Sequence, residues 1–260
     1  MKKIFFISLL FLLVACKHKN EANKGNIVQN QAENDTVLSH TSRDKSFIDF
    51  FEVFMWDKNF QKLRVIFPVN LNKSVINSVD KWVHLPFYSN KQYIPILCSD
   101  TVTCFEKDIE TKNIEVFILN FGNKPTLKYN FRKETDAWFL VGSEKIIGNK
   151  NIDTNFIDFI ERFSKDSIFQ LNHTQFPFKE VYADADRDYE TVDTLITKSN
   201  WKHINLVKEL DGLMVLSSMD KNNKFRNIYF RGVENGISIK YVFEKVKNEW
   251  IFIKLEDCST

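Results

Sequence analysis

The sequence contains one long segment twice. Residues 47–68 read FIDFFEVFMWDKNFQKLRVIFP, and residues 156–177 read FIDFIERFSKDSIFQLNHTQFP. The two segments align at a constant offset of 109 without a gap and are identical at 11 of 22 positions. Shorter matches follow, W-x-H at 82–84 and 201–203, and K-Y-x-F at 128–131 and 240–243. Such a repeat predicts that the folded part is two copies of one structural unit of about 105 residues.

The repeat divides the chain into four predicted parts. We expect a first α+β repeat over residues 46–148 and a second over residues 149–260. Residues 16–45 are polar and lack apolar periodicity, which is typical of a flexible tether. Residues 1–15 are predicted to be a signal peptide, for the reasons that follow.

The first 16 residues, MKKIFFISLLFLLVAC, combine two lysines, a short apolar run and a terminal cysteine. The run is too short to cross a bilayer, which needs about 20 apolar residues. The segment resembles a bacterial lipoprotein signal peptide, with Leu13-Val14-Ala15-Cys16 as the lipobox. This resemblance implies lipidation of Cys16 by diacylglyceryl and palmitoyl chains, and a cell-envelope location in contact with a membrane. Lys17 in place of a retention Asp favours the outer membrane, and the membrane face is left open.

The charge balance argues against a nucleic-acid partner. The whole chain has 36 Lys and Arg against 34 Asp and Glu. Removal of the signal peptide takes away Lys2 and Lys3, so 36 − 2 = 34 basic residues face 34 acidic ones. A formally neutral protein has no bulk attraction for a polyanion.

Each repeat is predicted to open with two helices. Phe47, Phe50, Phe51 and Phe54 recur at i, i+3, i+4 and i+7, which is one face of an α-helix. Ser46 and Asn155 stand where the first helix of each copy would be capped. Asp57 and Asp166 then predict the start of a second short helix, which in the first copy is expected to carry Phe60, Leu63 and Phe67 and to stop before Pro68.

The later part of each copy alternates with period two. Residues 127–131 and 237–243 place apolar side chains at every second position, as half-buried antiparallel strands do. Short polar turns at 133–136 and 245–248 predict hairpins whose return strands begin at Trp138 and Trp250. Helices followed by an antiparallel meander indicate the α+β class.

This order of elements resembles the nuclear transport factor 2-like cone, in which N-terminal helices pack on a bent antiparallel sheet. The words F-x-x-F, D-x-x-F-Q and F-P at 47–68 and 156–177 are similar to a family of uncharacterised bacterial lipoproteins with two tandem units. That family, a domain of unknown function, implies no activity. One departure is that His173 in the second copy replaces Arg64.

Three cysteines remain after Cys16. Cys98 and Cys104 flank a five-residue loop, and an envelope location permits a disulfide between them. The alternative is that Cys98, Cys104 and Cys258 are all reduced.

Few residues suggest chemistry. His84 and His203 hold matching W-x-H positions and are weak candidates for general acid–base catalysis, with a structural corner as the alternative. Asp184, Asp186 and Asp188 alternate in an insertion of ten residues and are weak candidates for a metal site, against an ordinary acidic loop. The chain lacks the usual motifs for nucleotides, phosphates or zinc, so no cofactor is expected.

We therefore predict a membrane-anchored module that binds a small apolar ligand or an envelope protein without catalysis. The first alternative is an enzyme like ketosteroid isomerase, with a pocket His or Asp. The second is a structural subunit of an envelope complex. An enzyme is the less favoured reading because the chain has none of the usual catalytic motifs. The Phe stripes could line an apolar pocket, with an ordinary core as the alternative.

Overall fold

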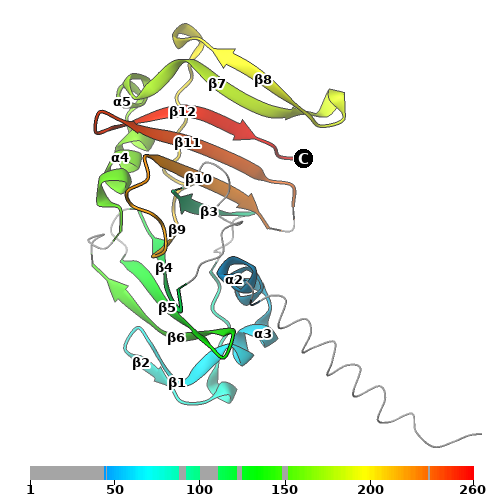
Figure 1. Ribbon diagram of the computed structural model, residues 1–260, viewed down its shortest axis with the longest axis vertical. Coiled ribbons are helices and arrows are strands. Elements are labelled where there is room, and N and C mark those ends of the chain that lie inside the picture. The colour runs from blue at the N-terminus through cyan, green and yellow to red at the C-terminus, as the bar shows by residue number, and fades with distance from the viewer. Residues whose placement is uncertain are drawn as a thin grey trace, which may run out of the picture. The chain divides into compact units, whose positions relative to one another are not determined.

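The computed structural model describes residue 44 and residues 46–87, 92–99, 111–121, 125–147, 152–233 and 235–260. These belong to one compact unit, Thr41–Thr260. We call residues 44–147 the first half and residues 152–260 the second half (Figure 1). The predicted boundary between residues 148 and 149 lies outside the described residues, as do the predicted signal peptide and nearly all of the tether.

Apart from one additional 3₁₀ turn in the second half, the two halves run through their elements in the same order. The first half contains helices α2 (Phe47–Trp56) and α3 (Lys58–Leu63), the 3₁₀ turn η1 (Val79–Lys81), and strands β1 (Val65–Leu71), β2 (Ser74–Ile76), β3 (Tyr93–Cys98), β4 (Asn113–Leu119), β5 (Thr126–Glu134) and β6 (Ala137–Ile146). The second half contains helices α4 (Thr154–Lys165) and α5 (Ser167–Asn172), the 3₁₀ turns η2 (Ala185–Arg187) and η3 (Lys198–Asn200), and strands β7 (Thr174–Asp184), β8 (Glu190–Ile196), β9 (Leu213–Leu216), β10 (Phe225–Gly232), β11 (Ser238–Val246) and β12 (Glu249–Asp257). The predicted α+β class is confirmed.

All the described strands join one sheet of twelve, in the order β2-β1-β6-β5-β4-β9-β3-β10-β11-β12-β7-β8. At the centre, each half contributes a strand to the other. Strand β9 of the second half pairs with β4, and β3 of the first half pairs with β10. Strands β3 and β9 then lie side by side in parallel (Figure 1).

The sheet carries one hydrophobic core on each face. Along β3, Ile94, Ile96 and Cys98 pack in the core of the first half, whereas Leu97 between them packs in the core of the second half. Strand β9 alternates in the same way. Because successive side chains of a strand point to opposite faces, α2 and α4 cover opposite faces of the sheet. This also explains why β9, Leu-Met-Val-Leu, is apolar and buried at every position.

The Phe stripes pack as predicted, and one predicted cap is wrong. Phe47, Phe50, Phe51 and Phe54 are all buried in the first core. Ser46 caps α2, since its hydroxyl accepts a hydrogen bond from the N–H of Asp49 at 3.1 Å. In the second half Asp153, not Asn155, caps the helix, and α4 begins one residue later at Thr154. Asp153 is favoured over Asn155 as the cap because its other carboxylate oxygen also binds a buried arginine, described below.

The second helix of the first half is shorter than predicted. Asp57 caps α3 through hydrogen bonds from the N–H groups of Asn59 and Phe60, and Asp166 caps α5 in the same way. Helix α3 ends at Leu63, which is 64% exposed, and Phe67 and Pro68 lie in strand β1. The spacing of Phe60, Leu63 and Phe67 suits a helix, but pairing of β1 with β6 and β2 takes over after Arg64.

The predicted hairpins are confirmed. Strands β5 and β6 join through Thr135 and Asp136, and strands β11 and β12 join through Lys247 and Asn248. All four turn residues have positive φ, as a tight two-residue hairpin requires.

Candidate functional site

Helix α2 borders a hollow on the side that faces the centre of the sheet. The floor is formed by apolar residues of β3 and β9 and the wall by α2, and the end of β10 and Val233 complete the lining. The lining side chains are Ile48, Phe51, Glu52, Met55, Trp56, Ile94, Ile96, Met214, Leu216, Arg231, Gly232 and Val233. The hollow has a cavity volume of about 40 Å³ and opens to solvent on one side. That space suits a short hydrocarbon chain or an apolar side chain better than a large ligand.

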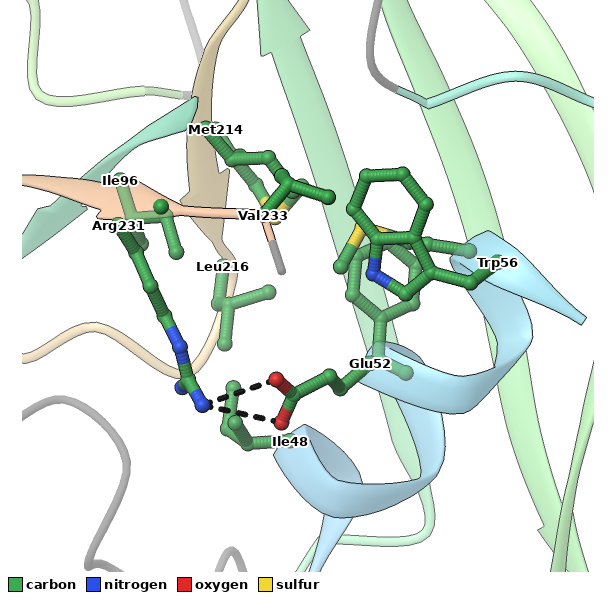
Figure 2. A pocket seen from close by; sticks show the side chains of 12 residues that line it. Ile48, Glu52, Trp56, Ile96, Met214, Leu216, Arg231 and Val233 are labelled. Atoms are coloured by element: carbon green, nitrogen blue, oxygen red, sulfur yellow. Dashed lines mark hydrogen bonds and ion pairs between the residues drawn. The ribbon is translucent and has the colours of Figure 1, made fainter. Parts of the chain in front are cut away.

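One ion pair stands at this otherwise apolar hollow. Arg231 of β10 donates from Nη2 to both carboxylate oxygens of Glu52, at 2.9 and 3.1 Å (Figure 2). Both side chains remain more than 40% exposed, so the pair lies at the mouth and not on the floor. An exposed pair of this kind contributes at most about 1 kcal/mol to stability. Its arrangement gives the hollow a charged, hydrogen-bonding rim above an apolar floor.

The hollow is shared between the two halves. Glu52 belongs to the first half, whereas Arg231, Met214 and Leu216 come from the second half. Strand β9 reaches the first core because it lies between β4 and β3, two strands of the first half. The exchange of strands therefore builds this site.

The place equivalent to the hollow in the second half is closed. At the offset of 109, Met55 and Trp56 correspond to Ser164 and Lys165. Ser164 donates to the carbonyl of Ile160 at 2.6 Å, and Lys165 pairs with Glu161 on its own helix. The small depression there is lined by Phe121, Glu161, Ser164, Lys165, Val207 and Leu210, and it has no room for a water-sized group.

The W-x-H candidates lie at a corner held by a glutamine. Gln61 on α3 donates to the carbonyls of Phe54 and Leu85, and its own oxygen accepts from Trp82 Nε1 and the N–H of Leu85. His84 contacts the carbonyl of Met55 through Nε2 at 3.2 Å. His84 is thus near α2 but does not line the hollow.

The second half repeats this corner. Gln170 donates to the carbonyls of Phe163 and Ile204 and accepts from the N–H of Ile204. His203 is exposed there. The structure does not bring His84 and His203 together, and the repeated F-Q word is explained by the glutamine that fixes the corner.

The acidic insertion extends the hairpin of β7 and β8. Asp184 accepts a hydrogen bond from the N–H of Asp186 and lies 3.4 Å from Arg187. Asp188 follows in a left-handed conformation. In the part of the chain that the structure describes, no three His, Cys, Asp or Glu side chains gather in a way that could hold a metal ion.

Two of the four cysteines, Cys98 and Cys258, lie among the described residues. Cys98 is disulfide-bonded, and Cys258 is free. Cys104 and Cys16 lie outside the described residues, so the Cys98–Cys104 pairing and the lipidation of Cys16 stay predictions. No described helix is both long and apolar enough to cross a membrane.

Two buried tyrosines stand at equivalent positions of the two halves. Burial raises the pKa of Tyr241 to about 12, with a smaller contribution from Asp257 and other nearby carboxylates. Burial also raises the pKa of Tyr129 above its ordinary value. Both hydroxyls therefore stay neutral at physiological pH, and neither lines the hollow.

The chain matches, over residues 27–257, the family described as a domain of unknown function, DUF4348. The chain belongs to this family. Among solved structures, the crystal structure of an NTF2-like protein from Bacteroides fragilis is similar to it. That structure shares 25% sequence identity over 84% of this chain and 98% of the other, with a TM-score of 0.60. No curated protein matches the chain.

These comparisons confirm the predicted kinship with an uncharacterised NTF2-like family. The family's description names no activity. Sequence reasoning did not single out Glu52 or Arg231, because they are 179 residues apart. The sequence pattern that could have drawn attention to Glu52 is its place between Phe51 and Met55, beside an otherwise apolar helix face.

Proposed function

We propose that this protein is a lipid-anchored, non-catalytic binding module of the cell envelope, and that it takes a small apolar ligand in the hollow beside α2. The observation that carries the proposal is the apolar floor of Ile94, Ile96, Met214 and Leu216 under the Glu52–Arg231 pair. An apolar pocket with few polar groups at its mouth is the usual form of a small-ligand site.

The pairing of Glu52 supports binding without catalysis. A general base needs a carboxylate or imidazole free to take a proton from the substrate. Among the described residues, Glu52 is the one acid that lines the hollow, and both of its oxygens accept from Arg231. Neither His84 nor His203 lines the hollow.

The architecture we propose is a duplicated NTF2-like unit whose two copies exchange their third strand. Two observations support this: the equal order of elements in the two halves, and the reciprocal pairing of β9 with β4 and of β3 with β10. In this view the duplication supplied the second set of strands from which the hollow is built.

The anchor is proposed from the lipobox that ends at Cys16. Metabolic labelling with a palmitate analogue tests it. We expect label on the natural chain and none on a Cys16→Ala variant, and label that persists in the variant would contradict the anchor.

Methionine methyl NMR tests the binding site. The chain from Cys16 onward has three methionines, of which Met55 and Met214 line the hollow and Met219 packs against the other core. A titration with n-hexanol, an uncharged apolar probe, should shift the methyl signals of Met55 and Met214 along one saturation curve. Met219 is the internal control and should not move. Equal shifts at all three methionines, or no shift, would contradict the proposal.

A further inference from the structure

One acidic position is used differently in the two halves. Asp44 and Asp153 are equivalent, since they stand 109 residues apart. Asp44 is 4% exposed, and one of its oxygens accepts from Arg64 Nη2 at 2.7 Å. The other accepts from the backbone N–H of Trp138 at 3.2 Å. In the first half, a carboxylate of the chain itself thus occupies the space between the end of α3 and the start of β6.

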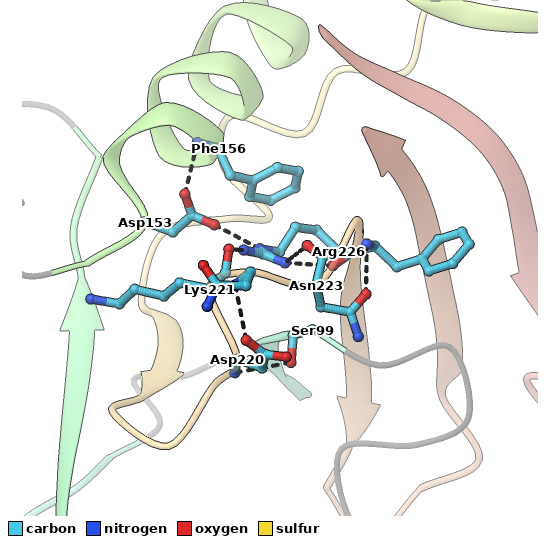
Figure 3. Close-up of polar contacts among 9 residues, drawn as sticks. Ser99, Asp153, Phe156, Asp220, Lys221, Asn223 and Arg226 are labelled. Atoms are coloured by element: carbon cyan, nitrogen blue, oxygen red, sulfur yellow. Dashed lines mark hydrogen bonds and ion pairs between the residues drawn. The ribbon is translucent and has the colours of Figure 1, made fainter. Parts of the chain in front are cut away.

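In the second half the equivalent carboxylate is held elsewhere. Asp153 accepts from the N–H of Phe156 and from Arg226 Nε at 2.6 Å (Figure 3). Arg226 is 1% exposed and is fixed further by the carbonyls of Lys221, Asn223 and Phe225. The position of Arg226 corresponds to Ile114 at the offset of 112 that relates the later strands. The first half therefore has no arginine there to draw its aspartate away.

A hollow remains where the first half holds Asp44. It has a cavity volume of about 230 Å³ and is lined by Asn155, Phe159, Phe169, His173, Lys245, Asn248, Glu249 and Trp250. Two of these match the residues that hold Asp44: His173 replaces Arg64, and Trp250 matches Trp138. Lys245 matches Lys133, which lies over the ring of Trp138. Asp153 is not among the lining residues.

The backbone around this hollow matches the first half closely. The N–H of Phe252 donates to the carbonyl of His173 at 2.7 Å, as that of Leu140 does to Arg64 at 2.8 Å. Because strands repeat every two residues, the N–H of Trp250 leaves β12 on the same edge as that of Phe252. It therefore points in the same direction as the N–H of Trp138, which in the first half donates to Asp44.

The side chains add further hydrogen-bonding groups. His173 stacks on Phe169 with ring centroids 3.8 Å apart, and its Nδ1 lies 2.8 Å from the carbonyl of Phe169. Since a carbonyl only accepts, Nδ1 carries a proton in this contact. Nε2 is then an acceptor in the neutral ring and donates only in the doubly protonated imidazolium form. Lys245 and Glu249 carry opposite charges that offset each other, so the charge left at the hollow is that of the His173 imidazolium.

We propose that this hollow binds a small organic carboxylate, in the place that Asp44 fills in the first half. Its oxygens accept from the N–H of Trp250 and from the Nε2–H of His173 in the imidazolium form, and its apolar body rests against Phe159 and Phe169. Selectivity comes from the hydrogen-bond donors, because Lys245 and Glu249 largely cancel each other. This site is separate from the apolar hollow beside α2.

Backbone amide NMR of the whole chain from Cys16, with Cys16→Ser to keep it free of lipid, tests the proposal with benzoate as the probe. We expect a saturable shift of the Trp250 amide signal and none of the Trp138 signal, since Asp44 already occupies that N–H. A silent Trp250, equal shifts at both tryptophans, or the same shift with chloride at equal ionic strength would overturn the proposal.

Two variants sharpen the test. His173→Arg restores the guanidinium of the first half and should tighten benzoate binding about tenfold, because a charged, forked donor replaces an imidazole. Unchanged or weaker binding would overturn the role of this position. Asp44→Ala opens the first-half space beside Arg64, so benzoate should now also shift the Trp138 amide. A Trp138 signal that stays fixed would overturn the equivalence on which the proposal rests.

Discussion

Helices α2 and α4 start from the same sequence words and cover opposite faces of one sheet, but the space beside them differs. Beside α2 lies an apolar hollow floored by strands of both halves. Beside α4, the equivalent place is closed by Val207, Leu210 and Phe121. The residues that the two helices share, above all their phenylalanines, are mostly buried in the two cores.

The comparison of the two halves distinguishes residues that maintain the fold from residues that form the hollow. Gln61 and Gln170 hold the same corner in both halves, so their repetition reflects structure. The hollow depends on positions that differ: Met55 against Ser164, and Arg231 against Leu119. Glu52 and Glu161 are identical residues, yet one pairs with β10 and the other with its own helix. When two halves of a chain share their helices and corners, the positions that differ between the halves are the better place to look for function.

The buried aspartates should give the largest effect. Asp153→Ala leaves Arg226 buried without its carboxylate and should lower the free energy of unfolding by about 3–5 kcal/mol. Asp44→Ala should cost a similar amount through Arg64. Urea unfolding of the two variants measures both values. A loss below about 1 kcal/mol at Asp153 would show that the pair is not a buried one.

The two tyrosines extend the comparison to alkaline pH. An unfolded tyrosine ionises near pH 10, whereas Tyr241 resists ionisation up to about 12. The folded state then binds more protons than the unfolded state, so stability is intact below pH 10 and falls as pH rises towards 12. The loss at Tyr241 amounts to roughly 2–3 kcal/mol. The free energy of unfolding, measured by urea unfolding as a function of pH, should therefore fall less steeply above pH 10 in Tyr241→Phe than in Tyr129→Phe. A slope that Tyr241→Phe leaves unchanged would contradict the role of Tyr241.

The corner glutamines come next. Gln61→Ala and Gln170→Ala should each cost about 1–3 kcal/mol, because the N–H of Leu85 or Ile204 loses its acceptor. The cost should be somewhat larger at Gln61, which also accepts from Trp82 Nε1, whereas Trp201 Nε1 has no partner among the described residues. Thermal unfolding compares the pair. A much larger loss at Gln170 would reverse this ranking.

The smallest effect should come from the rim of the hollow. Glu52→Gln should change the free energy of unfolding by less than about 1 kcal/mol, and salt should reduce the difference further, because the pair is exposed. Glu161→Gln is the matched control on α4. A loss above about 2 kcal/mol at Glu52 alone would mean that the pair holds the two halves together.

Much of the fold was predictable from local patterns. The phenylalanine spacing gave the first helices, and the period-two segments with their polar turns gave the hairpins. The order of the central strands was not predictable, because β3 and β9 are apolar on both faces. Without alternation, nothing in Tyr-Ile-Pro-Ile-Leu-Cys favours β4 over β10 as a partner. The cap of α4 was missed because Asp153 and Asn155 are both good capping residues.

The site was less predictable than the fold. Its floor depends on the pairing of β9 with β4, and its ion pair joins residues of different halves. The hollow of the second half depends on Asp153 turning towards Arg226, whose counterpart in the first half is Ile114. Contacts of this kind depend on tertiary structure and leave no local spacing to read.

The central claim is that the hollow beside α2 binds an apolar ligand and that the place beside α4 does not. The most direct test is the dissociation constant for n-hexanol, read from the Met55 methyl signal, in two matched variants. Leu216→Trp fills the hollow and should abolish saturable binding, whereas Val207→Trp crowds the closed place beside α4 and should leave the dissociation constant within about twofold of the natural chain. Binding that survives Leu216→Trp, or is lost only in Val207→Trp, would contradict the account.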